Sequence, residues 1–445
     1  MTVPARGADP PIPPAPPAGG KIVTDVLIVG AGPAGLAAAI ELRRLGAGRV
    51  LVADREPGAG GVPRHCAHTG YGLRDLHRVM TGPDYARHYA RLARQAGAEV
   101  LTGTTVTGWD DPGHVTMTSA AGVRTVSART LLLATGCRER PRSARLVPGT
   151  RPPGVMTTGE LQQRVYLHGQ GVAGRALVVG AEHVSYSAMV TLAHAGARVV
   201  ALVTDEPRPQ SYAAFRLGAA VRWRVPVWTS TAVTGLSGRD RLAAAELTDL
   251  RTGAVRTGAV RTVACDSIVF TGDWIPDHEL ARLAGLDMDP GSRGPAVDTA
   301  LTTSAPGVYA AGNLVHPAET ADVAALSGRH AARQIAAMLG RGRPDSGAGH
   351  QALPVPVPVQ VEAPLAWISP SVIRDPGTPP PRGRFVLRST EFRPRARLAV
   401  SQDGRTLATA RLSLRPARSL TLPAAWLPHV DRAGGPVRVH VKEWA

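Results

Sequence analysis

The sequence predicts an α/β protein with two dinucleotide-binding, Rossmann-like domains, the second inserted in the first, and a small C-terminal all-β appendage. Two strand–turn–helix–strand units, which begin at Lys21 and at Arg175, predict the nucleotide domains. The appendage is predicted because stretches after residue 365 alternate apolar and polar residues around an Asp403-Gly404 turn. No apolar run approaches the roughly 18 residues of a membrane span.

The same patterns set the expected domain boundaries. Residues 1–20 are expected to form a disordered, proline-rich lead. The first nucleotide domain is expected over 21–150 and 264–345, with a degenerate nucleotide domain inserted over 151–263. The stretch "QALPVPVPVQVEAPL" is interpreted as an extended connector, and the β domain is expected over 351–445.

The first unit carries a complete dinucleotide-binding loop. Gly30, Gly32 and Gly35 form a G-x-G-x-x-G directly after the apolar "VLIV" and before a helix. The glycines allow a tight turn, a close approach of the backbone to a pyrophosphate, and close packing of strand against helix. Asp54 ends the second strand, where a carboxylate would accept hydrogen bonds from a ribose. This unit therefore predicts dinucleotide binding.

Two later stretches indicate which dinucleotide is bound. "LLLATG" (131–136) and "GVYAAGN" (307–313) resemble the second and third signatures of FAD-binding flavoproteins with two dinucleotide domains. In that family the last turn ends in aspartate or asparagine, and here it ends in Asn313. The resemblance implies FAD as the cofactor. The residues expected to hold it are Gly30, Gly32, Pro33, Ala34, Gly35, Asp54, Arg55, Gly61, Val106, Ala134, Thr135, Gly136, Gly312 and Asn313.

A narrower resemblance rests on four stretches, "GGVPRHCAHTGYG", "ATGCRERPR", "HVSYSAMVTLAHAG" and "LTTSAPGVYAAGNLVHPAETAD". Together they resemble a subgroup of the pyridine nucleotide-disulfide oxidoreductase superfamily. That subgroup includes the FAD subunits of opine oxidases, hydrogen cyanide synthase and hydroxyproline or sarcosine-type dehydrogenases. The resemblance covers residues 21–345 and leaves out the C-terminal β segment, in which we identify no cluster of chemically active residues.

The cysteines argue against thiol–disulfide chemistry. Disulfide reductases of the superfamily carry a C-x4-C pair after the position of Gly61, but this segment holds only Cys66, flanked by His65 and His68. One thiol cannot form a local disulfide, and three cysteines cannot complete a four-cysteine iron–sulfur site. His65, Cys66 and His68 are weak catalytic candidates beside the flavin, or else polar members of a packed loop. No metal site is predicted.

The second loop, "VGAEHVSYS" (179–187), departs from the nucleotide-binding pattern. Gly180 is present, but Glu182 stands in the second glycine position and Ser185 in the third. A carboxylate here would repel a diphosphate. The acid expected after the next strand is present as Asp205 or Glu206. This second site is therefore expected to be altered, and the use of NAD(P)H stays open.

These observations predict an FAD-dependent oxidoreductase that transfers a hydride between flavin and a small organic donor or NAD(P)H. The alternative is a non-catalytic or electron-relay subunit that holds FAD or an adenine nucleotide within a hetero-oligomeric dehydrogenase. Expected partners are a small-molecule substrate and either a dehydrogenase subunit or an electron acceptor. The net charge of +17 does not indicate nucleic acid, because the arginines are scattered rather than clustered. The absence of a signal sequence and the few cysteines favour the cytoplasm.

Overall fold

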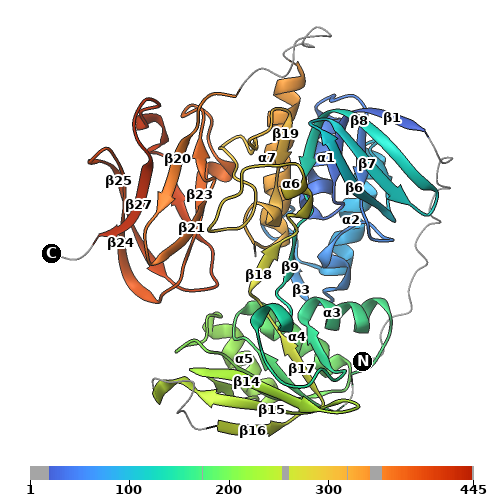
Figure 1. The fold of residues 1–445 in the computed structure, drawn as a ribbon, viewed down its shortest axis with the longest axis vertical. Helices are drawn as coiled ribbons and strands as arrows, with labels where there is room; N and C mark the ends of the chain where they lie inside the picture. The colour runs from blue at the N-terminus through green and yellow to red at the C-terminus, as the bar shows by residue number, and fades with distance from the viewer. Residues whose placement is uncertain (1–19, 173, 253–259, 318, 341–352, 443–445) are drawn as a thin grey trace.

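The computed structural model describes residues 20–172, 174–252, 260–317, 319–340 and 353–442. Figure 1 shows three bodies: the first nucleotide domain in blue and teal, the second in green, and the C-terminal β domain in orange and red. The long helix α7 (Ala321–Gly340) lies between the first domain and the β domain. Apart from Gly20, the expected lead over 1–20 lies outside the described residues.

The first domain is built on a seven-stranded sheet in the order β5-β2-β1-β8-β7-β6, with β19 paired to β8. Its parallel part consists of β5 (Glu99–Leu101), β2 (Val50–Ala53), β1 (Lys21–Val29), β8 (Gly122–Leu133) and β19 (Val308–Ala310). An antiparallel meander of β6 (Thr104–Asp111) and β7 (His114–Ser119) extends from β8. Val29 is in register with Leu133, and Leu133 with Ala310. The three FAD-type motifs therefore follow strands that end at one level of the sheet.

Helices of small residues cover this sheet closely. Helix α1 (Pro33–Arg44) packs against α7, and a Cβ added at Gly328 of α7 would lie 1.9 Å from the carbonyl oxygen of Ala34. Helix α2 (Gly82–Gln95) packs beside α1 and buries Tyr85 and Tyr89. Short elements complete the domain: η1 (Val62–His65), β3 (Thr69–Tyr71), β4 (Met80–Thr81), η2 (Arg142–Arg145), α6 (Glu279–Leu283) and η5 (Gly312–Leu314).

The second domain contains a five-stranded parallel sheet in the order β10-β17-β11-β12-β13. These strands are β10 (Val155–Thr157), β17 (Ser267–Phe270), β11 (Arg175–Val179), β12 (Arg198–Val203) and β13 (Val227–Trp228). The helices are α3 (Thr158–Gln162), the π-helix η3 (Gln163–Leu167), α4 (His183–His194) and α5 (Ala213–Trp223), followed by a meander of β14 (Thr231–Gly238), β15 (Leu242–Asp249) and β16 (Val260–Ala264), with η4 (Leu250–Thr252). The chain enters through β9 (Cys137–Glu139) and returns through its antiparallel partner β18 (Trp274–Pro276). The second domain is thus inserted in the first.

The C-terminal domain is a β-sandwich around its own hydrophobic core. One sheet has the order β22 (Val372–Ile373), β20 (Val357–Val361), β27 (Val437–Lys442), β24 (Arg393–Gln402) and β25 (Arg405–Leu414). The other contains β21 (Leu365–Ser369), β23 (Arg384–Ser389) and β26 (Leu420–Pro423), with η6 (Pro381–Gly383) and η7 (Leu427–His429) in the loops. The interpretation of "QALPVPVPVQVEAPL" as a mere connector was wrong, because alternate residues Val357 and Val359 enter the core and make β20 an interior strand.

The sandwich contacts both nucleotide domains. Arg374 forms an ion pair with Asp298 of the first domain at 3.2 Å, and both side chains are buried. Arg418 donates from Nε to the carbonyl oxygen of Gln210 in the second domain at 2.8 Å and stacks on the Tyr212 ring at 3.8 Å. The predicted fold class is confirmed. Among the described helices, none has the length and apolar character needed to cross a membrane.

Candidate functional site

Four glycines converge on the N-terminus of α1. The φ angle of Gly30 is +107°, and a Cβ there would lie 2.4 Å from the carbonyl oxygen of Ala134 in the second motif. A Cβ on Gly35 would lie 1.9 Å from the carbonyl oxygen of Gly30. A Cβ on Gly61 would approach the Cα of Gly32 to 2.8 Å, and one on Gly312 would approach the Cβ of Ala34 equally closely. The backbone segments of all three motifs and of the Gly60-Gly61 turn are therefore in contact.

Gly32 is the exception, because a Cβ at this position would meet no protein atom within 4 Å. Gly32 caps α1 without any side-chain hydrogen bond, and Pro33 occupies the first turn. The N–H groups at a helix N-terminus attract an anion because they lack partners inside the helix. Open space beside such a terminus fits the diphosphate of a dinucleotide, so the residues present fit FAD.

Asp54 is held directly beside this loop. Its Oδ2 accepts a hydrogen bond from the Ala31 N–H at 2.5 Å, and its Oδ1 accepts one from the Glu56 N–H at 2.8 Å. Burial raises the pKa of this carboxyl group, while the two backbone donors act against that shift. The next residue, Arg55, is exposed and forms an ion pair with Asp277 at 3.0 Å. The acid expected at the end of β2 is thus positioned by the glycine loop itself.

Asp277, which the sequence did not single out, ties the second motif to the returning strand β18. The Thr135 hydroxyl donates to the carbonyl oxygen of Asp277 at 2.8 Å, and the Asp277 N–H donates to the carbonyl oxygen of Gly136 at 2.9 Å. The buried Asp277 carboxylate also pairs with Arg138. Only the position of this aspartate, directly after "WIP" at the domain crossover, could have indicated the role.

Asn313, at the end of the third motif, fixes the loop that follows it. Its Nδ2 donates to the carbonyl oxygen of Glu319 at 3.1 Å, and its Oδ1 accepts from the Glu319 N–H at 3.0 Å. An amide satisfies both backbone groups, whereas an ionised carboxylate has acceptors alone. This explains asparagine at a position where aspartate is common in the family.

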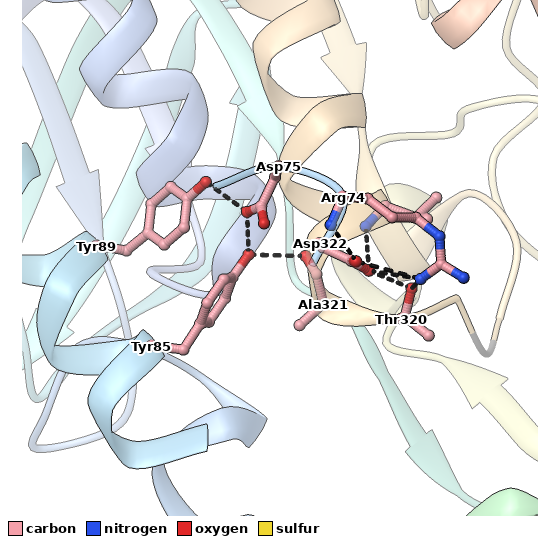
Figure 2. Close-up of polar contacts among 8 residues, drawn as sticks. Arg74, Asp75, Tyr85, Tyr89, Thr320, Ala321 and Asp322 are labelled. Atoms are coloured by element: carbon pink, nitrogen blue, oxygen red, sulfur yellow. Dashed lines mark hydrogen bonds and ion pairs between the residues drawn. The ribbon is translucent and has the colours of Figure 1, made fainter. Parts of the chain in front are cut away.

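A buried polar network holds the start of α7 (Figure 2). Asp75 Oδ2 accepts hydrogen bonds from the hydroxyls of Tyr85 and Tyr89, each at 2.6 Å. Burial raises the pKa of both phenols, so they remain protonated donors. Arg74 pairs through Nη1 with the buried Asp322 carboxylate at 3.2 Å. The network joins α2 and the 72–78 loop to the first turn of α7, and no sequence pattern indicated Asp75.

The three weak catalytic candidates occupy different environments. His65 is buried, and burial with the nearby Arg64 lowers its pKa to about 4, which keeps the ring neutral. Burial raises the pKa of the Cys66 thiol to about 12, and its Sγ donates to Gln162 Oε1 at 3.1 Å. His68 is half-buried, and its Nδ1 lies 2.9 Å from the carbonyl oxygen of Thr69. Cys66 is thus an unreactive thiol at the contact between the nucleotide domains.

The second loop is filled by its own side chain. Glu182 Oε2 accepts from the Ala181 N–H at 2.9 Å, and Oε1 accepts from the Thr271 hydroxyl at 2.5 Å. A Cβ on Gly180 or on Gly272 would lie within 2.7 Å of this carboxylate. The carboxylate therefore occupies the position beside the N-terminus of α4 that a phosphate would need. Burial raises its pKa, against the hydrogen bonds it receives.

The remaining predicted positions are at the edges of the two sites. Val106 is half-buried on β6 and packs against the core of the first domain. Asp205 is exposed just after β12, and the following residue, Glu206, accepts the Ser230 N–H at 2.9 Å through its carbonyl oxygen. Ala134 donates its N–H to the carbonyl oxygen of Val29 at 2.8 Å, which aligns the second motif with β1.

Comparison with known proteins places this geometry among known folds. A family model described as pyridine nucleotide-disulphide oxidoreductase matches residues 24–328. The A-type subunit of opine oxidase from Rhizobium meliloti (strain 1021) is 30% identical over 337 residues, which cover 71% of this chain and 72% of that protein. The alpha subunit of sarcosine oxidase from Corynebacterium sp. (strain P-1) is 36% identical over 219 residues, which are 45% of this chain and 21% of that protein.

Solved structures share the fold at lower identity. Thioredoxin reductase of T. acidophilum has a TM-score of 0.58 at 21% identity and covers 71% of this chain and 98% of its own. A NAD-dependent persulfide reductase from A. fulgidus has a TM-score of 0.57 at 20% identity and covers 90% of this chain and 72% of its own. These likenesses show a common architecture of two nucleotide domains.

Proposed function

The chain belongs to the pyridine nucleotide-disulphide oxidoreductase family, and on that premise we propose that it oxidises a small organic molecule as one subunit of a larger FAD-dependent dehydrogenase. It is an FAD-dependent oxidoreductase, as its three motifs predict. Bound FAD supplies a two-electron acceptor for the donor. The residues that would hold it are those around the N-terminus of α1, with Gly32 leaving the space for the diphosphate.

A thiol donor does not fit this chain. Cys66, Cys137 and Cys265 are all free, and the Cys66 thiol is buried against Gln162 with its pKa raised to about 12 by burial. A thiol of this kind is protonated at neutral pH and a poor nucleophile. The chain therefore departs from the disulfide-reducing members of its family.

The position of Glu182 carries the proposal that the donor is not a nicotinamide. Its carboxylate takes the Ala181 N–H and the Thr271 hydroxyl, and it sits between Gly180 and Gly272. A diphosphate would have to displace a negative charge that is already hydrogen-bonded. We infer that the second nucleotide domain serves as a structural partner for the first, with its phosphate position permanently occupied.

The relatives support an assembly. Three of them are named as subunits of opine oxidase, sarcosine oxidase and hydrogen cyanide synthase. The chain spans about a fifth of the alpha subunit of sarcosine oxidase that it matches. A partner chain therefore supplies either the electron acceptor or part of the donor site in this proposal. The free cysteines suit the cytoplasm, where thiols stay reduced.

The test is an anaerobic assay of the purified holoprotein with an opine and with sarcosine as donors, and a redox dye as acceptor. Loss of the flavin absorbance band with either donor, with dye reduction, supports the proposal. Turnover by the isolated chain would rule out a purely electron-relaying subunit. A flavin that responds to NADH and to no organic donor contradicts the proposal.

A further inference from the structure

One face of the three-stranded sheet in the C-terminal sandwich is turned toward the first nucleotide domain. On β23, Phe385 and Leu387 enter the sandwich core, so Arg384, Val386 and Arg388 point to the opposite side. Arg388 reaches the loop after the third motif, where its Nη2 lies 3.4 Å from the carbonyl oxygen of Pro317. A sheet face that would ordinarily meet water thus covers the segment next to Asn313.

Three buried polar atoms in this contact have no hydrogen-bond partner. They are Nδ1 of His316, Oε1 of Glu319 and Nε of Arg388. Trp367 of β21 lies between two of these residues, with its ring 5.2 Å from the His316 ring and 5.3 Å from the Arg388 guanidinium. Buried polar groups in folded proteins nearly always have partners, so three orphans in one contact indicate a missing molecule.

The charge of this contact favours an anion. Arg388 hydrogen-bonds to Pro317 and to the Ser419 hydroxyl oxygen at 3.2 Å, and no carboxylate of the described residues comes within ion-pair distance of it. Burial lowers the pKa of Arg388, while Glu319 and Cys137 act in the opposite direction. Burial also raises the pKa of Glu319, which weakens it as a counter-charge. A guanidinium removed from water is costly unless an anion pairs with it.

A small cavity adjoins the same face. Its volume is about 40 Å³, on a scale where one water needs roughly 10–15 Å³. The polar residues that line it are His316, Ser327, Ser369, Arg382, Arg384 and Thr421. The space suffices for a carboxylate group with a short carbon chain, and arginine recognises carboxylates through paired N–H donors.

We propose that the contact between the sandwich and the 315–319 loop binds a small monocarboxylate, with Arg388 as its cationic partner and His316 as a neighbouring hydrogen-bonding group. The site goes beyond the proposed function, because the bound carboxylate need not be the electron donor. It assigns a ligand-binding role to the C-terminal domain, and the proximity of Arg388 to Cys137 places that ligand next to the second FAD motif.

The test is saturation-transfer NMR on the full-length holoprotein, with acetate as the probe and acetamide as its neutral analogue. Transfer to the acetate methyl group is expected at millimolar concentration, with little transfer to acetamide. Chloride at the same ionic strength should not displace the acetate. Equal transfer to acetate and acetamide, or none to acetate, would overturn the proposal.

Variants separate this site from general stability. Arg388→Gln is expected to weaken acetate binding at least about tenfold, and Arg388→Lys is expected to restore part of it. Arg411→Gln, an exposed position on β25 in the other sheet, is the matched control and should bind as the wild type does. If Arg388→Gln fails to fold, Ser419→Ala provides the second test, because it removes a group that holds the guanidinium.

Each outcome for the variants is decisive. Unchanged binding in folded Arg388→Gln, or in both Arg388→Lys and Ser419→Ala, would overturn the proposal. The flavin content of each variant is read from its absorbance spectrum. A yellow protein that ignores acetate rejects this inference alone, whereas a colourless protein rejects the proposed FAD function.

Discussion

The carboxylate of Glu182 accepts the hydroxyl hydrogen of Thr271 at 2.5 Å and thereby closes the second glycine loop from within. Thr271 follows β17 and Glu182 precedes α4, so the bond joins the two edges of the crevice in which a dinucleotide would lie. The same carboxylate takes the Ala181 N–H. The substitution of glycine by glutamate therefore replaces an external anion with an internal one.

Removal of this carboxylate should open the loop. In Glu182→Gly the Ala181 N–H and the N-terminus of α4 become free to meet a phosphate, and a negative charge is lost. We expect the affinity for NADH to rise at least about tenfold, measured by isothermal titration calorimetry. Glu160→Ala, an exposed glutamate in the first turn of α3, is the control. Equal NADH affinity in all three proteins would show that Glu182 does not block the site.

Two glycines of the first loop should fail in different ways. In Gly32→Ala the new methyl group meets no protein atom, so the chain should fold with an unchanged melting temperature but lose FAD. In Gly35→Ala the methyl group would lie 1.9 Å from the carbonyl oxygen of Gly30, so the fold itself should be lost. Circular dichroism and flavin absorbance per chain separate the two effects. A fully yellow Gly32→Ala protein would place the diphosphate elsewhere.

Asn313 should not tolerate aspartate. In Asn313→Asp the carbonyl oxygen of Glu319 loses its donor and faces a carboxylate. An unpaired buried carbonyl costs about 1–3 kcal/mol, which should appear as a lower unfolding midpoint in urea. The apoprotein is the form to measure, since FAD would add its own contribution. An unchanged midpoint would mean that the amide does not hold the loop.

The Cys66 thiol should resist alkylation. Because burial raises its pKa to about 12, the thiolate fraction at pH 8 is on the order of 10⁻⁴. Iodoacetamide should leave Cys66 unmodified in the native protein and modify it fully in urea, as read by peptide mass spectrometry. Rapid modification in the native state would reject the buried, protonated thiol.

Glu139 should make stability depend on pH. Burial raises its pKa to about 7 from an unfolded value near 4.5, although hydrogen bonds from Gly159 and Thr158 oppose this. The folded state therefore retains this proton between pH 4.5 and 7, so the stabilisation is present at low pH and is lost as the pH rises through that range. The loss amounts to at most about 3 kcal/mol.

The variant Glu139→Gln isolates this effect. It should lack the corresponding part of the pH dependence of the unfolding midpoint between pH 5 and 7.5. The comparison of variant with wild type removes the contribution of all other titrating groups. Parallel pH profiles for the two proteins would contradict the assignment.

The fold class could be predicted from the sequence because its signals are local. Strand, glycine turn and helix follow one another within each unit, so Gly30, Gly32 and Gly35 are recognisable without tertiary information. The role of β20 was missed because proline-punctuated valines suggest an extended segment but do not reveal its neighbours. Pairing of β20 with β27 depends on residues far along the chain.

The site was predictable only where a motif carries it. Asp277 and Asp75 escaped notice because each acts through partners distant in sequence, namely Thr135 and the tyrosines of α2. Arg388 escaped for the same reason, since an arginine in an alternating strand is usually exposed. Its burial follows from how the sandwich docks on the first domain, which no local pattern encodes.

The central claim is an FAD enzyme whose second nucleotide loop is closed to nicotinamides. Its most direct test is anaerobic titration of the purified wild-type protein with NADH and then NADPH, following the flavin absorbance band. We expect a yellow protein whose band is unchanged at several equivalents of either nucleotide. Bleaching within seconds at stoichiometric NADH or NADPH would contradict the claim.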